Sequence, residues 1–163
     1  MARTTFSGAV NSTNGFEMDQ VPIMQPTVNI TAASATLTQA THAGALITLN
    51  PSAGVAIVLP AATGTGATYR ILIGTTVGAS STIKVASSSD TMVGFVSHAT
   101  TTAGAGLHEA AGGTDDTITM NGTTTGGIVG SYIELTDYAS TKWRVNAHLV
   151  GSGALATSLS ATV

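Results

Sequence analysis

Apolar and polar residues alternate with a period of two along most of the chain, which is the spacing of a strand with one buried face. The clearest case is residues 142–149, where one face holds Trp143, Val145, Ala147 and Leu149 and the other holds Lys142, Arg144, Asn146 and His148. Strand-like segments bounded by turn residues also occur at residues 27–31, 45–49, 55–59, 68–73, 82–86, 92–96, 117–120 and 132–136. We therefore predict nine strands, with Trp143 as a core residue rather than a binding anchor.

These strands recur roughly every ten residues with Gly, Asn and Pro between them, which is typical of an all-β sandwich or barrel. No segment keeps the helical period of about 3.6 residues, and only residues 99–111 are a candidate for a helical turn. A repeat of about 20 to 50 residues is also absent from the sequence, which disfavours a solenoid. We predict one β-domain over residues 27–163, a jelly-roll-like sandwich or a barrel.

Residues 1–26 differ from the rest of the chain. Phe6 and Phe16 stand apart among Gly, Asn and Ser, and no strand or helix period runs through the segment. Pro22 and Pro26 restrict the backbone that leads into the domain to extended conformations. We expect an extended N-terminal arm that lies on its own domain or docks on a partner chain; the alternative is a frayed terminus.

Small residues dominate the composition. The 163 residues include 29 Thr, 25 Ala, 19 Gly and 15 Ser, while aromatic residues make up 4% and charged residues 8%, against about 25% charged in ordinary domains. Small side chains bury little apolar area at about 25 cal/mol per Å², and few charges are left to protect the strand edges. We therefore expect a symmetric homo-oligomer.

Composition and charge disfavour several classes of protein. Five Lys and Arg at a net charge of −3 do not make a nucleic-acid-binding face, and 43% hydrophobic residues argue against a disordered chain. The lack of cysteine excludes a disulfide scaffold, a thiol enzyme and a cysteine-based zinc site. We find no run of about 20 apolar residues and no apolar signal segment at the start, so we expect no membrane partner.

Candidate chemistry in the sequence is sparse. The histidines His42, His98, His108 and His148 show no local zinc spacing. The pairs His108-Glu109 and Asp115-Asp116 contain metal-ligating side chains that could approach each other across a Gly-rich loop. We expect this loop to be too mobile to hold a metal site. No nucleophile elbow, phosphate-binding loop or aromatic platform beside paired carboxylates is found. We predict no catalytic residues, no metal and no cofactor, and therefore no enzyme.

Several segments resemble small virion proteins of tailed bacteriophages. They are the Arg-Thr-Thr-Phe opening within residues 3–10, and residues 12–16, 44–50, 57–64 and 69–70, together with the Trp143 strand and the Gly-Ser-Gly at residues 151–153. The resemblance covers nearly the whole chain and is to head decoration, or cement, proteins, those of cyanophages among them.

The resemblance implies a small, β-rich, non-catalytic homotrimer, made in the host cytoplasm, on the outer surface of the capsid. Its partner would be the major capsid protein, contacted by an arm that includes Arg3, Thr4, Phe6, Val10, Phe16 and Met18. Similar β-modules occur in tail fibres and spikes. The alternative function is therefore an adhesive module that binds host saccharide or protein through loops such as residues 97–117.

Overall fold

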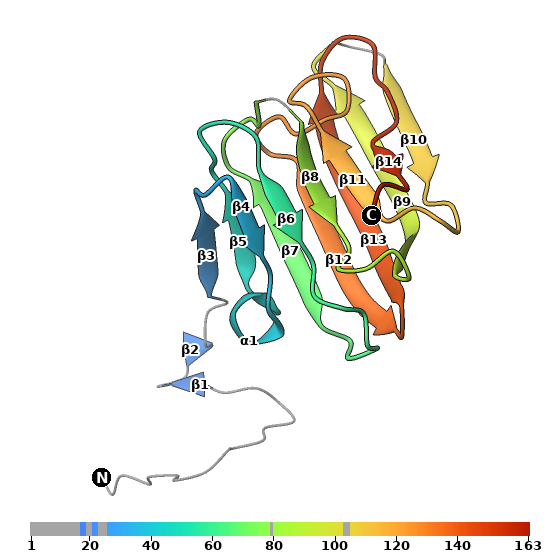
Figure 1. The fold of residues 1–163 in the computed structure, drawn as a ribbon. Helices are drawn as coiled ribbons and strands as arrows, with labels where there is room; N and C mark the ends of the chain where they lie inside the picture. Colours follow the sequence, from blue (N-terminus) through green and yellow to red (C-terminus); the bar gives the residue numbers. More distant parts are fainter. Residues whose placement is uncertain (1–16, 19–20, 23–25, 79, 103–104) are drawn as a thin grey trace, which may run out of the picture.

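The structure is a computed structural model and describes residues 17–18, 21–22, 26–78, 80–102 and 105–163. It contains two β-sheets packed face to face (Figure 1). One sheet has the order β10 (Gly106–Ala110), β9 (Thr91–Thr100), β13 (Lys142–Gly151), β12 (Tyr132–Ala139), β7 (Thr68–Ile73), β5 (Leu46–Leu49) and β3 (Thr27–Ile30). The other has the order β14 (Leu159–Ser160), β11 (Thr117–Met120), β8 (Ser81–Lys84), β6 (Ala56–Val58) and β4 (Ser34–Thr36). In addition, β1 (Glu17–Met18) pairs with β2 (Val21–Pro22), and α1 (Gln39–His42) joins β4 to β5.

The predicted all-β sandwich is confirmed, and each of the nine predicted strands is present. The sequence patterns missed β4, β10 and β14, which are short and consist mostly of small or polar residues. They also missed the two-residue strands β1 and β2 and the short helix α1. The candidate helical turn at residues 99–111 is wrong. Residues 106–110 form β10 instead, because Gly106 to Ala110 pair antiparallel with residues 95–99 of β9.

The first half of the domain winds back and forth between the two sheets. From β3 to β8, consecutive strands alternate between the sheets, and each pairs in parallel with the strand two before it or two after it. Thr27 lies opposite Leu46, and Leu46 opposite Arg70, so successive turns differ in length. This half therefore winds like a solenoid although no sequence repeat marks it, and its parallel pairs differ from the antiparallel pairing of a jelly roll.

Polar side chains stack at one corner of this winding. Asn50 Nδ2 donates to Asn29 Oδ1 at 2.8 Å, and Thr75 Oγ1 donates to Asn50 Oδ1 at 3.0 Å. A Cβ atom at Gly74, on the next turn, would collide with the Asn50 side chain, so a larger residue there would displace Asn50. The corner thus satisfies its polar groups from one turn of the chain to the next, as side-chain ladders do in stacked strands.

The second half of the chain completes both sheets. Strand β9 crosses to the far side of the seven-stranded sheet, where it pairs in parallel with β13. The antiparallel pair β12–β13 then fills the space between β7 and β9 (Figure 1). In the other sheet, β11 and β14 extend the row begun by β4, β6 and β8.

The core lies between the sheets. The predicted alternation on β13 is confirmed: Trp143, Val145, Ala147 and Leu149 are buried. The rings of Tyr69 and Trp143 meet edge to face, with centroids 5.6 Å apart. Tyr69 and Trp143 are the aromatic members of a core otherwise filled mainly by Ile, Leu, Val and Met.

Trp143→Ala should lower the free energy of unfolding by about 3–5 kcal/mol, because it leaves a cavity at the Tyr69 contact. Equilibrium urea unfolding followed by circular dichroism measures the loss. The matched control is Phe95→Ala, on the outer face of the same sheet, which should change stability by no more than about 0.5 kcal/mol. Equal losses in the two variants would contradict this description of the core.

Candidate functional site

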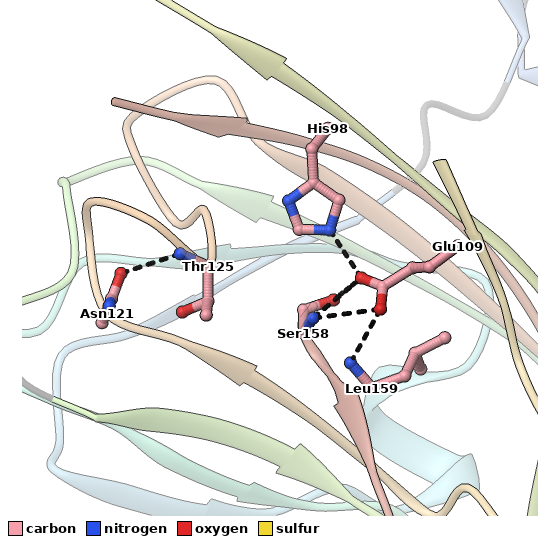
Figure 2. A network of polar contacts seen from close by, with 6 residues as sticks. All are labelled: His98, Glu109, Asn121, Thr125, Ser158 and Leu159. Atoms are coloured by element: carbon pink, nitrogen blue, oxygen red, sulfur yellow. Dashed lines mark hydrogen bonds and ion pairs between the residues drawn. The ribbon is translucent and has the colours of Figure 1, made fainter. Parts of the chain in front are cut away.

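A buried histidine, a glutamate and a buried serine form a polar network at one edge of the sandwich (Figure 2). His98 Nε2 lies 2.6 Å from Glu109 Oε1, and Ser158 Oγ donates to the same oxygen at 2.6 Å. The backbone N–H of Ser158 donates to this carboxylate at 2.8 Å, and that of Leu159 at 3.3 Å. One carboxylate therefore accepts hydrogen bonds from a ring, a hydroxyl and two backbone amides.

This network ties the two sheets together at one edge of the sandwich. His98 and Glu109 belong to β9 and β10 of the seven-stranded sheet, whereas Leu159 begins β14 of the five-stranded sheet. Burial raises the pKa of Glu109, but the hydrogen bonds from Ser158, His98 and Leu159 together outweigh burial and hold the pKa below its ordinary value of 4.5. The ionised form is thus the one that the fold stabilises.

Asp116 holds the end of the chain in a similar way. Its carboxylate accepts hydrogen bonds from the backbone N–H groups of Thr162, at 2.8 Å, and Val163, at 3.3 Å. It also accepts a hydrogen bond from the hydroxyl of the neighbouring Thr117 at 2.7 Å. Together, Glu109 and Asp116 bind the last six residues of the chain to the sandwich.

Asp137 holds the loop between β6 and β7. The backbone N–H groups of Thr63, Gly64 and Thr65 donate to it at 3.2, 2.7 and 3.0 Å, and Thr65 Oγ1 donates at 2.8 Å. Burial raises the pKa of Asp137, but these bonds outweigh burial and place the pKa below its ordinary value of 3.8. Gly64 has a φ of +79°, which lets three successive amides converge on one carboxylate.

The His98 network lacks the geometry of a nucleophilic site. Ser158 Oγ donates to Glu109, so the hydroxyl is bonded to a carboxylate and not to the histidine base. Ser158 and His98 are both buried, and no cavity or cleft is found in the part of the chain that the structure describes. No cluster of three potential metal ligands occurs among these residues either. The hydrogen bonds of this network hold β9, β10 and the C-terminal segment together.

The structure does not bring together the pair His108-Glu109 and the pair Asp115-Asp116 as a metal site. Glu109 is bonded to His98 and Ser158, whereas Asp115 accepts a hydrogen bond from the backbone of Gly112 at 2.5 Å. The expectation of a mobile loop was wrong for Glu109, since it lies in a paired strand. The pairing of Glu109 with Ser158, far along the sequence, had no local signal by which sequence reasoning could find it.

The predicted arm residues fall mostly outside the described chain. Arg3, Thr4, Phe6, Val10 and Phe16 all lie there, and Met18 is in β1. The role assigned to these six residues therefore stays a prediction.

A surface site is present on the outer face of the seven-stranded sheet. We define the basic–aromatic face by the outward side chains of its central strands: Arg70, Phe95, Tyr132, Tyr138, Lys142 and Arg144. The strand registers make it continuous, since Arg70 lies opposite Glu134, Glu134 opposite Asn146, and Asn146 opposite Phe95. The sequence signal for this face was the polar half of the alternation at residues 142–149.

Comparison with known proteins identifies no family. No model of a protein family matches this chain, and no curated protein matches it. In the described ranges, no helix has the length and apolar character needed to cross a membrane. The function must therefore be inferred from the fold, the polar network and the exposed face.

Glu109→Gln should lower the free energy of unfolding by about 2 kcal/mol at pH 7, because a neutral amide replaces a carboxylate that accepts charge-assisted hydrogen bonds. As the pH falls below 4.5, the unfolded wild-type chain takes up a proton at Glu109 before the folded chain does. Wild-type stability should therefore decline until the pH reaches the folded pKa, and the gap to the variant should narrow. Urea unfolding at several pH values measures both curves.

The control for this prediction is Glu134→Gln, which removes a carboxylate from the exposed ion pair with Arg70. It should cost at most about 1 kcal/mol and leave most of the decline in acid unchanged. If Glu109→Gln behaved like this control, the network would not stabilise the fold as described.

Proposed function

We propose that the protein is a structural virion protein, a decoration or cement protein that binds the outside of a tailed-phage head as a homotrimer. The resemblance to such proteins lies in residues 3–10, 12–16, 44–50, 57–64 and 69–70, together with the Trp143 strand and residues 151–153. In this role the protein bridges major capsid subunits and stabilises the assembled shell by mass action, because it binds the assembled state.

The observation that best supports a structural role is the use of ionisable side chains as internal ties. Glu109, Asp116 and Asp137 each accept two or more hydrogen bonds from backbone amides of a distant loop or tail. Ties of this kind fix loops and chain ends that the apolar core does not hold. A rigid body is what a bridge between capsid subunits requires.

The way residues 1–26 join the domain fits the proposed arm. They lead directly into β3, an edge strand of the seven-stranded sheet, so the arm begins at the periphery of the sandwich. An extended arm can add to an exposed strand edge of a capsid subunit through its backbone hydrogen bonds. Three arms on one trimer would act together, which raises the total affinity by about 10² to 10⁴ over one arm.

The copy number of the protein in purified virus particles tests this function. Quantitative mass spectrometry should give about one copy of this protein per copy of the major capsid protein, as expected for a symmetric covering of the shell. A ratio near about one to a hundred would overturn the proposal and favour an adhesive module of a tail fibre or spike.

Deletion of residues 2–20 tests the arm. The truncated protein should lose binding to capsids that lack the protein, measured by co-sedimentation, because the proposed contacts of Phe6, Val10 and Phe16 are removed. Its circular dichroism spectrum and thermal unfolding should match those of the full chain, since the sandwich begins after residue 26. Full retention of capsid binding by the truncated protein would contradict the arm mechanism.

A further inference from the structure

Aromatic residues in the described chain are divided between the core and one outer surface. Tyr69 and Trp143 are buried between the sheets, whereas Phe95, Tyr132 and Tyr138 belong to the basic–aromatic face. Phe95 is 47% exposed and Tyr138 is 48% exposed. In a chain with 4% aromatic residues, three of them on one sheet face mark that face for contact with another molecule.

A glycine with unusual backbone geometry precedes Phe95 in β9. Gly94 has a φ of +128° within β9, and a Cβ atom at this position would collide with the carbonyl oxygen of Val145 on β13. Only glycine allows this close approach, although glycine weakens a strand interior. The strand thus keeps an unfavourable residue next to its exposed phenylalanine.

The positive charges of the domain gather on the same face. The described chain has four Lys and Arg residues: Arg70, Lys142 and Arg144 are on this face, and Lys84 is on the outer face of the five-stranded sheet. Glu134 is the carboxylate of the face and pairs with Arg70 at 3.3 Å. Within the described residues, no carboxylate forms an ion pair with Arg144 or Lys142.

The net charge of −3 hides this asymmetry. Asp90, Asp116 and Asp137 are buried, and Glu109 is bonded to the C-terminal segment. Their oxygens are therefore not available to bond a partner, whereas Arg144 and Lys142 form no ion pair with a described carboxylate.

We propose that the basic–aromatic face binds an acidic surface of a partner protein. Aromatic residues with arginine are the residues that carry most binding energy in protein interfaces, and unpaired cations select a partner of opposite charge. A second copy docked through the same face would set Arg144 against like charges, which disfavours self-association here. Three cations are too few to hold a nucleic-acid backbone. That this partner is the capsid rests on the proposed function.

Charge reversal tests this inference with a matched control. Arg144→Glu in the full chain should weaken binding to capsids that lack the protein by at least about tenfold, whereas Lys84→Glu, the same change on the opposite sheet, should weaken it less than about twofold. Added salt should weaken the wild-type protein more than Arg144→Glu. Equal binding by the two variants would overturn the inference while leaving the proposed function intact.

The aromatic part of the face has its own pair of variants. Phe95→Ser should weaken capsid binding by about tenfold or more, while Val129→Ser, which replaces a residue 55% exposed in the loop before β12, should have little effect. Thermal unfolding of each variant shows whether the sandwich is retained. Loss of binding by both variants to the same extent would contradict a role specific to Phe95.

A second measurement tests the acidic-partner preference of the basic–aromatic face without using capsids. Poly-L-glutamate is added to ¹⁵N-labelled full-length protein. The amide resonances that shift should cluster on β7, β9, β12 and β13, and the shifts should be smaller in Arg144→Glu. If the wild-type protein failed to bind capsids, the proposed function would fail and this titration would still decide the face. Shifts elsewhere, no shifts, or a stronger response to heparin would overturn the acidic-protein partner.

Discussion

The sandwich depends on carboxylates that accept backbone N–H groups across its edges. The core between the sheets packs Ile, Leu, Val and Met around Tyr69 and Trp143, whereas loops and chain ends gain little from this apolar burial. Glu109, Asp116 and Asp137 each bind amides of a segment distant in sequence and give it a fixed position. A hydrogen bond to a charged group is worth more than one between neutral groups, so few charges suffice. The low charge content of the chain and the internal use of its acids are therefore connected.

The strand positions could be predicted because alternation is a local property. The nine predicted strands all formed, and the inner face of β13 was assigned correctly down to Trp143. The order of the strands could not be predicted, because turns of unequal length produce a solenoid-like winding without a repeat. Strand β10 was missed because none of its residues is buried, and the hydrogen bond from Ser158 to Glu109 that fixes it is a contact that no local pattern records.

The candidate site, like the fold, could be predicted where it depends on local sequence and could not where it depends on contacts between distant strands. The cationic half of the basic–aromatic face was visible in the alternation of residues 142–149, whereas its continuation to Arg70 and Phe95 depends on strand registers. Net charge was a poor guide to this surface. It counts buried and exposed groups alike, and here the buried groups are mostly acids. Surface charge becomes predictable only when the partners of each carboxylate are known.

Both proposed contact regions belong to the seven-stranded sheet. The arm enters at its edge strand β3, and the basic–aromatic face covers its central strands β7, β12, β13 and β9. A single layer can therefore meet the partner with a face and an arm at once, which couples two moderate contacts into one stronger attachment. The opposite layer presents small side chains such as Thr36, Thr82 and Thr119, with Lys84 as its cation. In the proposed arrangement the five-stranded sheet faces away from the partner, and the hydrogen bonds from Ser158 and Leu159 to Glu109 join the two layers.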